Sequence, residues 1–215
     1  MEFRQERRKG SKREQTILRK ASYNSAEQVA VGEADPYLRP SFSLWNRMRR
    51  GLWNMCWLVL YRPSPRPLHW WRSMLLRIFG AKMGPSCHFY PGSKVWAPWN
   101  LRCADQVTLA DGAEIYNPAL IHMGSHAILS QGAYVCGATH DFDSPAFPLL
   151  AYSAQIGPYA WVCARASVCP GVNIGEGAVL GLGSVASRDL DPWTVYVGSP
   201  ARKVKERRRT DLMER

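Results

Sequence analysis

The chain has 215 residues, 46% of them apolar, and a net charge of +11, which predicts one compact domain with an appendage. The N-terminus lacks the apolar core of a signal peptide, and the longest nearly apolar window, Leu52 to Tyr61, has about half the length of a membrane span. The positive charge belongs to the ends of the chain, because residues 1–20 hold eight Lys and Arg against three acids, whereas residues 82–199 hold five against eight. No module that reads nucleic acid accompanies these basic ends, so nucleic acid is not an expected partner.

Residues 1–40 are polar, charged and without hydrophobic periodicity. Such a composition buries too little apolar surface to offset the entropy that ordering costs. We expect this segment to be a basic, mostly disordered arm.

Residues 41–80 are rich in Trp, Leu, Met and Arg and predict an amphipathic helical segment. Ser43 can cap a helix that reaches about Tyr61, and the run RPSPRP then breaks the chain. A second helix from about Leu68 to Phe79 is expected to end at Gly80. Basic residues interleaved with Trp and Leu are typical of a helix in a membrane interface. Alternatively, the apolar faces pack on the rest of the protein or on another subunit, and both arrangements can hold at once.

The stretch from Ile156 to Val185 divides into five six-residue units, IGPYAW, VCARAS, VCPGVN, IGEGAV and LGLGSV. Each unit begins with a large aliphatic residue, its second residue is small, and its fifth is small or β-branched. A period of six fits neither a helix nor a simple strand, and it predicts a β-solenoid whose backbone turns at regular intervals. The aliphatic residues would stack in the interior, while the small residues would let successive coils approach each other.

Imperfect coils precede this stretch, and the same rhythm appears in MGSHAI, LSQGAY and VCGATH. A solenoid domain is therefore predicted over residues 81–200. Val135 and Ile156 are 21 residues apart, which is not a whole number of units, so residues 141–155 are predicted to form an excursion loop. After Gly198 we expect a short capping strand or helix, with residues 201–215 as a basic C-terminal tail.

The six cysteines contain no C-x-x-C pair. Cys136, Cys163 and Cys169 occupy the second position of a unit, so they are explained as compact corner residues rather than ligands, nucleophiles or disulfides. This cysteine usage favours a reducing compartment and predicts a cytoplasmic protein.

His140 closes the unit VCGATH at the start of the predicted excursion loop, where it could face a cleft between subunits. An imidazole accepts a proton at neutral pH, and a positioned general base contributes about 10²–10⁴ in rate. The alternative is a structural histidine. We favour a catalytic one.

The units resemble the left-handed parallel β-helix of the hexapeptide-repeat acyltransferases. GATHDF, the pair Ala160–Trp161, VCPGVNIGEGAVLGLGSVASRDL and VGSPARKVK are similar to the catalytic half of the maltose- and galactoside-type acetyltransferases. NRMRRGLW, LLRIFGAKMG, APWNL, LSQGAYVCGATHDF and SPAR more narrowly resemble the bacterial colanic-acid-type exopolysaccharide O-acetyltransferases. The resemblance covers about residues 42–205. It implies an all-β solenoid, left-handed against the general rule for crossovers, with an N-terminal helical extension.

The resemblance also implies a homotrimer with sites between neighbouring subunits, each supplied with acetyl-CoA along the coils. His140 would take the proton from a sugar hydroxyl as the oxygen attacks the thioester carbonyl. Asn117 in IYNP matches an asparagine near the acceptor pocket, unless it is only a turn residue before Pro118. Trp161 matches an aromatic residue at the thioester end of the cofactor cleft, unless it only covers a neighbouring coil.

Further cofactor contacts follow from the same resemblance. Backbone groups after the unit IGEGAV would approach the pantetheine arm, and basic residues near the C-terminus would bind the phosphates. Ser187 and Arg188 stand where the family commonly has Thr and Lys, and Ala164 stands where relatives can have Ser, so one hydrogen bond to the cofactor can be missing. The implied cofactor-binding residues are Trp161, Ala164, Gly181, Leu182, Gly183, Ser184, Ser187, Arg188, Arg202 and Lys205.

These expectations describe an acetyl-CoA-dependent O-acetyltransferase of exopolysaccharide biosynthesis, which acts on a sugar or lipid-linked glycan and needs no metal. Residues 41–80 would place it at the inner face of the membrane as a peripheral protein. One alternative is a γ-type carbonic anhydrase with zinc held by His122, His126 and His140, but their positions in the units do not converge. The other alternative is a non-catalytic, membrane-docked scaffold.

Overall fold

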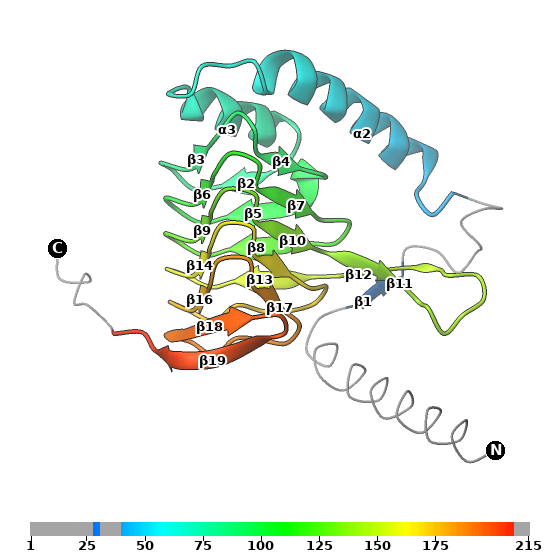
Figure 1. Ribbon diagram of the computed structural model, residues 1–215. Coiled ribbons are helices and arrows are strands. Elements are labelled where there is room, and N and C mark those ends of the chain that lie inside the picture. The colour runs from blue at the N-terminus through cyan, green and yellow to red at the C-terminus, as the bar shows by residue number, and fades with distance from the viewer. Residues whose placement is uncertain (1–27, 31–39, 209–215) are drawn as a thin grey trace.

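The computed structural model describes residues 28–30 and 40–208. Its main body is a column of stacked coils, with a helical extension across one end and a hairpin that leaves the column on one side (Figure 1). On each face of the column, the strands of successive coils pair in parallel. This is the solenoid that the six-residue period predicts.

Three sheets form the faces of the column. The first face contains β2 (Lys82–Met83), β5 (Leu101–Cys103), β8 (Ile121–Met123) and β13 (Ala154–Ile156). The second face contains β3 (His88–Phe89), β6 (Thr108–Leu109), β9 (Ile128–Leu129), β14 (Trp161–Val162), β16 (Val179–Leu180), β18 (Thr194–Gly198) and β19 (Ala201–Glu206). The third face contains β4 (Lys94–Val95), β7 (Glu114–Tyr116), β10 (Tyr134–Cys136), β15 (Ser167–Val168) and β17 (Val185–Ala186), and the 3₁₀ turn η2 (Pro98–Asn100) follows β4.

The first residue of each six-residue unit points into the column. None of these residues in the regular stretch is more than 2% exposed, and the fifth residues are buried as well. Burying one large aliphatic side chain contributes about 1.5–3 kcal/mol, so this ladder is a main source of the stability of the column. Its members are Ile156, Val162, Val168, Ile174 and Leu180.

Two positions of the unit make the corners, and the sequence pattern identified only one of them. At the second position of its unit, a Cβ on Gly157 would lie 2.6 Å from the backbone nitrogen of Glu176 in the next coil, so a larger residue does not fit at Gly157. At the fourth position the backbone is left-handed, with φ of 62° at Gly177 and 55° at Tyr159. Because some of these corners hold bulky residues despite the free energy this costs, side-chain size alone does not reveal where the chain turns.

The helical extension consists of α2 (Leu44–Cys56), the π-helical segment η1 (Trp57–Tyr61) and α3 (His69–Ile78). Ser43 caps α2, because its hydroxyl accepts a hydrogen bond from the backbone N–H of Asn46. Gly80 takes a φ of 98° just beyond α3 and so ends that helix as predicted. Within the described part of the chain, no helix is both long enough and apolar enough to cross a membrane.

One side of the extension packs on the first coil. The indole N–H of Trp53 donates to the carbonyl oxygen of Val95 at 2.7 Å, and the hydroxyl of Tyr61 lies 2.7 Å from that of Ser93. The buried guanidinium of Arg72 donates to main-chain carbonyl oxygens of the first coil and of the loop before α3. Packing of the helices on the solenoid, one of the two expected arrangements, is therefore confirmed for this side.

The excursion from the column is an antiparallel hairpin of β11 (Ala138–His140) and β12 (Leu149–Tyr152). The predicted limits, residues 141–155, are wrong at both ends, because strand pairing extends the hairpin back to Ala138 and the chain rejoins the first face at Ala154. The six-residue period does not show where this pairing begins or ends, so it could not predict the limits of the hairpin.

Strand β1 (Gln28–Ala30) pairs antiparallel with the free edge of β12. For these three residues the expected disorder is wrong, because the open edge of β12 offers backbone groups that need partners. The remainder of the predicted basic arm before residue 40 lies outside the described residues.

At the other end of the column, β19 folds back antiparallel on β18 (Figure 1). Of the two elements expected after Gly198, a short capping strand or a helix, the structure has the strand, and it occupies the start of the predicted tail. Residues 209–215 of that tail lie outside the described residues.

Candidate active site

His140 is the last residue of β11, and its side chain is exposed beside the hairpin loop. Its ring nitrogen Nδ1 lies 2.6 Å from the carbonyl oxygen of Phe147. Because a carbonyl oxygen only accepts hydrogen bonds, Nδ1 carries the proton and the neutral ring presents Nε2 as its basic nitrogen. Phe147 has a φ of 44°, which is rare for a bulky residue. The conformation of this loop therefore selects the tautomer of His140.

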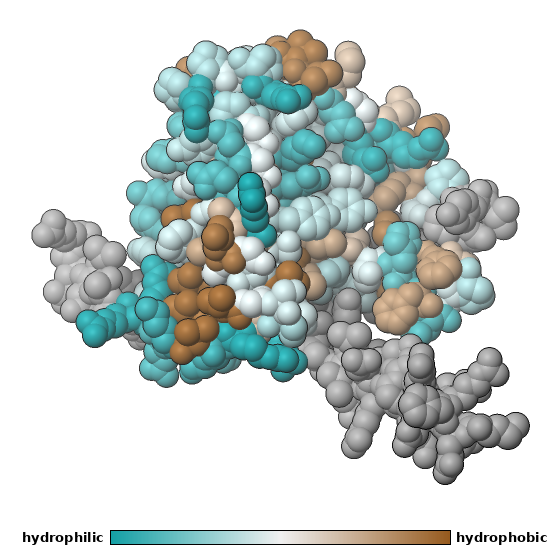
Figure 2. Space-filling view, in the orientation of Figure 1, coloured by the Kyte–Doolittle hydropathy of each residue, from teal (hydrophilic) through white to brown (hydrophobic). Residues whose placement is uncertain are grey.

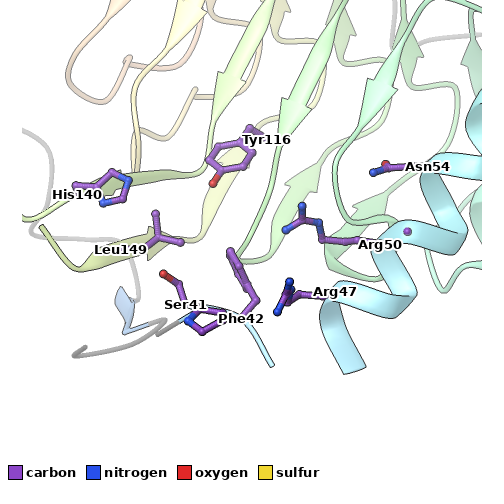
Figure 3. Close-up of a pocket in the computed structure, with 10 residues that line it drawn as sticks. Ser41, Phe42, Arg47, Arg50, Asn54, Tyr116, His140 and Leu149 are labelled. Atoms are coloured by element: carbon purple, nitrogen blue, oxygen red, sulfur yellow. The ribbon is translucent and has the colours of Figure 1, made fainter. Parts of the chain in front are cut away.

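A cavity of about 600 Å³ lies beside His140. Its walls come from the segment before α2, from α2 itself, from β7 and from the β11–β12 hairpin (Figure 3). Figure 3 shows the imidazole of His140, the hydroxyl of Tyr116 and the guanidinium of Arg50 around one space. The ten lining residues include Phe42, Arg47, Arg50, Tyr116, His140 and Leu149.

Tyr116 on β7 lines the cavity together with residues of the helical extension and of the hairpin. Its ring meets that of Trp96 edge to face, with ring centroids 5.3 Å apart. Burial raises the pKa of the Tyr116 hydroxyl, the nearby Cys136 adds to the rise, and Arg50 opposes it. The hydroxyl is therefore protonated and can donate a hydrogen bond into the cavity. Sequence reasoning missed Tyr116, although strand alternation places it outward when its neighbour Ile115 points inward.

Asn117 does not present its carboxamide to this cavity. The residue is fully buried, its side-chain oxygen accepts from the backbone N–H of Ala97 at 2.9 Å, and its side-chain nitrogen donates to the Ala97 carbonyl oxygen at 2.8 Å. The expected contact of Asn117 with the acceptor or with His140 is therefore corrected, because both polar groups are engaged by the preceding coil. Asn117 holds the coil beneath the site.

Trp161 lies on β14 in the second face, where its Nε1 donates to the Ser130 hydroxyl at 2.8 Å. The indole is 43% exposed and borders a second hollow, of about 450 Å³, on the outer side of this face. Figure 1 shows β14 and the β11–β12 hairpin on opposite sides of the column. A single copy of the chain therefore does not bring Trp161 and His140 together.

The other residues implied for the cofactor lie toward the C-terminal end of the column. Gly183 donates its N–H to the Ala164 carbonyl oxygen at 3.0 Å, so these two residues form one corner, and the side chain of Leu182 is 73% exposed there. Ser184 is buried instead, and its hydroxyl accepts from the N–H of Gly198 at 2.9 Å. The remaining residues are Gly181 after β16, Ser187 and Arg188 after β17, and Arg202 and Lys205 on β19.

Arg207, which the sequence placed in a solvated tail, contacts the column instead. Its guanidinium donates to the carbonyl oxygens of Tyr159 at 2.9 Å and Gly177 at 3.0 Å. Both acceptors are corner residues with left-handed backbone. The sequence of a basic run does not show which of its residues donates to carbonyl groups of the column.

The three histidines considered for zinc lie on different elements. His122 is on β8, His126 is at a corner with a φ of 58°, and His140 is on the hairpin. Across residues 28–30 and 40–208, no group of three or more His, Cys, Asp or Glu side chains is placed to hold a metal ion.

No family model matches the chain. WcaF of Escherichia coli (strain K12), a protein named for acetyl transfer in colanic acid biosynthesis, is 34% identical over 166 residues, which is 77% of this chain and 91% of that protein. A maltose O-acetyltransferase from Clostridium difficile 630 has a TM-score of 0.71 at 20% identity, over 78% of this chain and 90% of that chain.

A second solved structure is a hexapeptide-repeat acetyltransferase from Vibrio cholerae O1 biovar eltor in complex with acetyl coenzyme A. It has a TM-score of 0.66 at 22% identity, over 77% of this chain and 88% of that chain. These solved structures are left-handed parallel β-helices, and this chain has the same fold, which confirms the predicted handedness. Because the identity to WcaF extends over most of both sequences, this chain belongs to the hexapeptide-repeat acetyltransferases.

Proposed function

We propose that this acetyltransferase moves an acetyl group from acetyl-CoA to a sugar hydroxyl, with His140 as the general base. The observation that carries the proposal is the hydrogen bond from Nδ1 to Phe147, which in the neutral imidazole makes Nε2 the proton-accepting nitrogen of a ring that lines the cavity. Nε2 takes the hydroxyl proton while the sugar oxygen attacks the thioester carbonyl carbon. The carbon–sulfur bond then breaks, and the imidazolium returns the proton to the departing thiolate. The products are an acetyl ester and free CoA, without an acyl-enzyme.

The relatives support the two substrates. WcaF is named for colanic acid biosynthesis, which favours a sugar or a lipid-linked glycan of exopolysaccharide synthesis as the acceptor. The Vibrio cholerae structure contains acetyl coenzyme A, which favours the same donor here.

The active unit is proposed to be a homotrimer. The β11–β12 hairpin, which carries His140, and β14, which carries Trp161, lie on opposite sides of one column (Figure 1), so the two residues can share a site only when the hairpin of one copy meets the second face of another. Trp161 of that neighbouring copy would then contact the thioester end of the cofactor.

The cofactor is proposed to lie along the corner that Ala164 and Gly183 form. Small residues at this corner allow close approach of the pantetheine arm, and the exposed Leu182 supplies an apolar contact. Arg202 and Lys205 are exposed on β19 at the end of the column, where they suit the phosphates of CoA.

The side of the helical extension that faces away from the column is proposed to bind the membrane surface peripherally. Figure 2 shows apolar atoms at the top of the molecule, over this extension. Residues 41–80 contain seven Arg and no acidic residue, which complements an anionic lipid surface. Within α2 and η1, Trp45, Met48, Leu52, Met55 and Leu58 follow one another at intervals of three or four residues. The exposed large apolar side chains of these two elements are Leu44, Trp45, Met48, Leu52, Met55, Leu58, Val59 and Leu60.

An assay with acetyl-CoA and a panel of nucleotide-linked and lipid-linked sugars tests the enzymatic proposal. Chromatography measures the CoA that is released with each sugar. His140→Gln is expected to lower kcat by about 10²–10⁴ without changing the oligomeric state measured by light scattering. His122→Gln, on the exposed side of β8, is the matched control and should retain activity. Unchanged turnover in His140→Gln would overturn the assignment of the base.

Flotation with vesicles tests the membrane proposal. The wild type should float with vesicles that contain phosphatidylglycerol, and the double variant Trp45→Ser, Leu52→Ser should remain at the bottom of the gradient. Loss of the trimer rather than of flotation in this variant would instead assign the apolar side to a subunit contact.

A further inference from the structure

The cavity beside His140 is cationic. Arg47 and Arg50 enter it from α2, three residues apart on one side of the helix, and none of its ten lining residues is acidic. Neither guanidinium has a carboxylate partner in the described part of the chain, where ion pairs join Arg66 to Asp111 and Lys203 to Glu206. Two unpaired guanidinium groups in one cavity suggest a ligand of opposite charge.

Aromatic rings hold Arg50 in place. Its guanidinium carbon lies 4.1 Å from the centroid of the Trp96 ring and 5.6 Å from that of Phe42. Such stacking uses the faces of the guanidinium and leaves the N–H groups at its edge free to donate. In Figure 3 the guanidinium points into the space that Tyr116 and His140 border. The donor fork is therefore oriented before any ligand arrives.

The shift in the pKa of Arg50 also indicates a site for an anion. Burial lowers the pKa of Arg50, Tyr116 opposes the shift, and the positive charge of Arg47 adds to it. A bound anion would relieve the repulsion between the two guanidinium groups and replace the water that burial removes from Arg50. The apo cavity is thus arranged to bind negative charge.

We propose that the acceptor carries an oxyanion, either a uronic acid carboxylate or a phosphate, and that Arg50 and Arg47 bind it while a nearby hydroxyl of the same acceptor meets His140. The inference rests on the proposed acetyl transfer and names the substrate class of that site. The oxyanion fixes the register of the sugar, since a bidentate guanidinium contact sets both distance and orientation. Tyr116 can donate a further hydrogen bond to the acceptor.

Two matched pairs of probe sugars test the inference with the full-length protein. Nitrophenyl β-glucuronide against nitrophenyl β-glucoside isolates a carboxylate, and α-glucosyl phosphate against methyl α-glucoside isolates a phosphate. Calorimetry measures binding, and CoA release measures turnover. The wild type is expected to bind the anionic member of at least one pair about 10- to 100-fold more tightly. The pair that shows the preference identifies the source of the oxyanion.

Arg50→Gln and Arg47→Gln should each reduce this preference. Arg47 makes no ring contact in the described structure, so its variant tests the charge even if loss of the Trp96 contact loosens α2 in the Arg50 variant. Arg50→Lys should recover part of the preference, because it restores charge without the fork. Arg62→Gln is the control, since Arg62 is exposed on the same extension but outside the cavity.

Equal binding of both members of each pair, including no measurable binding of any probe, would overturn the inference. So would a preference that survives the Arg47→Gln, Arg50→Gln double variant. His140→Gln separates this result from the proposed function, because it should keep the preference in binding and lose turnover. If its turnover is unchanged while the preference holds, only the assignment of the base fails.

Discussion

Nδ1 of His140 lies 2.6 Å from the carbonyl oxygen of Phe147, across the loop that joins β11 to β12. The two residues are seven positions apart, so the hydrogen bond depends on the whole loop. It also depends on the left-handed backbone of Phe147, with a φ of 44°. The tautomer and orientation of the imidazole are therefore tied to the shape of a short exposed loop, and substitutions in the loop should alter catalysis without changing His140 itself.

Phe147→Pro and Phe147→Gly form a matched pair that tests this link. Proline fixes φ near −65° and removes the N–H that donates to the Ser144 carbonyl oxygen, so the carbonyl group that orients His140 should move. We expect kcat to fall about 10- to 100-fold, with the KM for acetyl-CoA unchanged. Glycine accepts the left-handed conformation, and Phe147→Gly should keep most of the activity. Equal activity of the two variants in steady-state kinetics would contradict the link.

Asn117→Ala should destabilise the protein rather than abolish its chemistry. Removing the carboxamide leaves the buried N–H of Ala97 without its partner, while the Ala97 carbonyl oxygen still accepts from the N–H of Asn100 at 3.0 Å. Urea unfolding should therefore show a loss of about 1–3 kcal/mol, the cost of one unpaired buried group. Activity per folded protein, measured well below the unfolding midpoint, should remain. Loss of activity in a fully folded variant would restore Asn117 as a residue that contacts the acceptor.

The six-residue period predicted the column because it depends on local repetition. Ile156 and the four aliphatic residues that follow it in phase all point inward. His140 was singled out because it stands where the period breaks, and its role as the base stays a prediction. The cavity was not predictable from the repeat, because Arg50 reaches Tyr116 only through the packing of α2 on the first coil, and that packing has no period. For Asn117, the motif match predicted a contact with the acceptor, but the burial of its carboxamide shows that this contact is not made within the chain.

Close contact between coils makes a specific prediction about Gly157. A Cβ at this position would lie 2.6 Å from the backbone nitrogen of Glu176 and 2.8 Å from the carbonyl carbon of Gly175. Because these atoms belong to the backbone of a stacked coil, Gly157→Ala should cost about 1–3 kcal/mol, as overpacking does in protein cores. Chemical unfolding of the purified variant measures the loss.

Gly51→Ala is the control for that experiment. Gly51 lies in α2, and a Cβ there meets nothing within 4 Å. Alanine is favoured over glycine in a helix interior by about 0.8–1.0 kcal/mol, so this variant should be slightly more stable than the wild type. Similar losses in both variants would show that the coils do not constrain Gly157 more than an exposed helix constrains Gly51.

The contact between Tyr61 and Ser93 predicts a pH dependence at alkaline pH. The Tyr61 side chain is 1% exposed, and burial raises its pKa well above the usual range, although the hydrogen bond with Ser93 and the charge of Arg72 oppose the shift. In the unfolded chain the same hydroxyl ionises near pH 10. The folded state therefore binds more protons than the unfolded state above that pH, and the free energy of unfolding falls as pH rises.

For one group this slope reaches about 1.4 kcal/mol per pH unit. The contribution of Tyr61 is fully present below about pH 10 and declines as pH rises beyond it. Tyr61→Phe removes this titration, so its free energy of unfolding should fall less steeply than that of the wild type. At neutral pH the variant should lose about 1 kcal/mol with the hydrogen bond. Other buried tyrosines and cysteines titrate in both proteins, and taking the difference removes their share. Parallel curves in urea unfolding between pH 9 and 11 would mean that Tyr61 ionises as readily in the folded protein as in the unfolded chain.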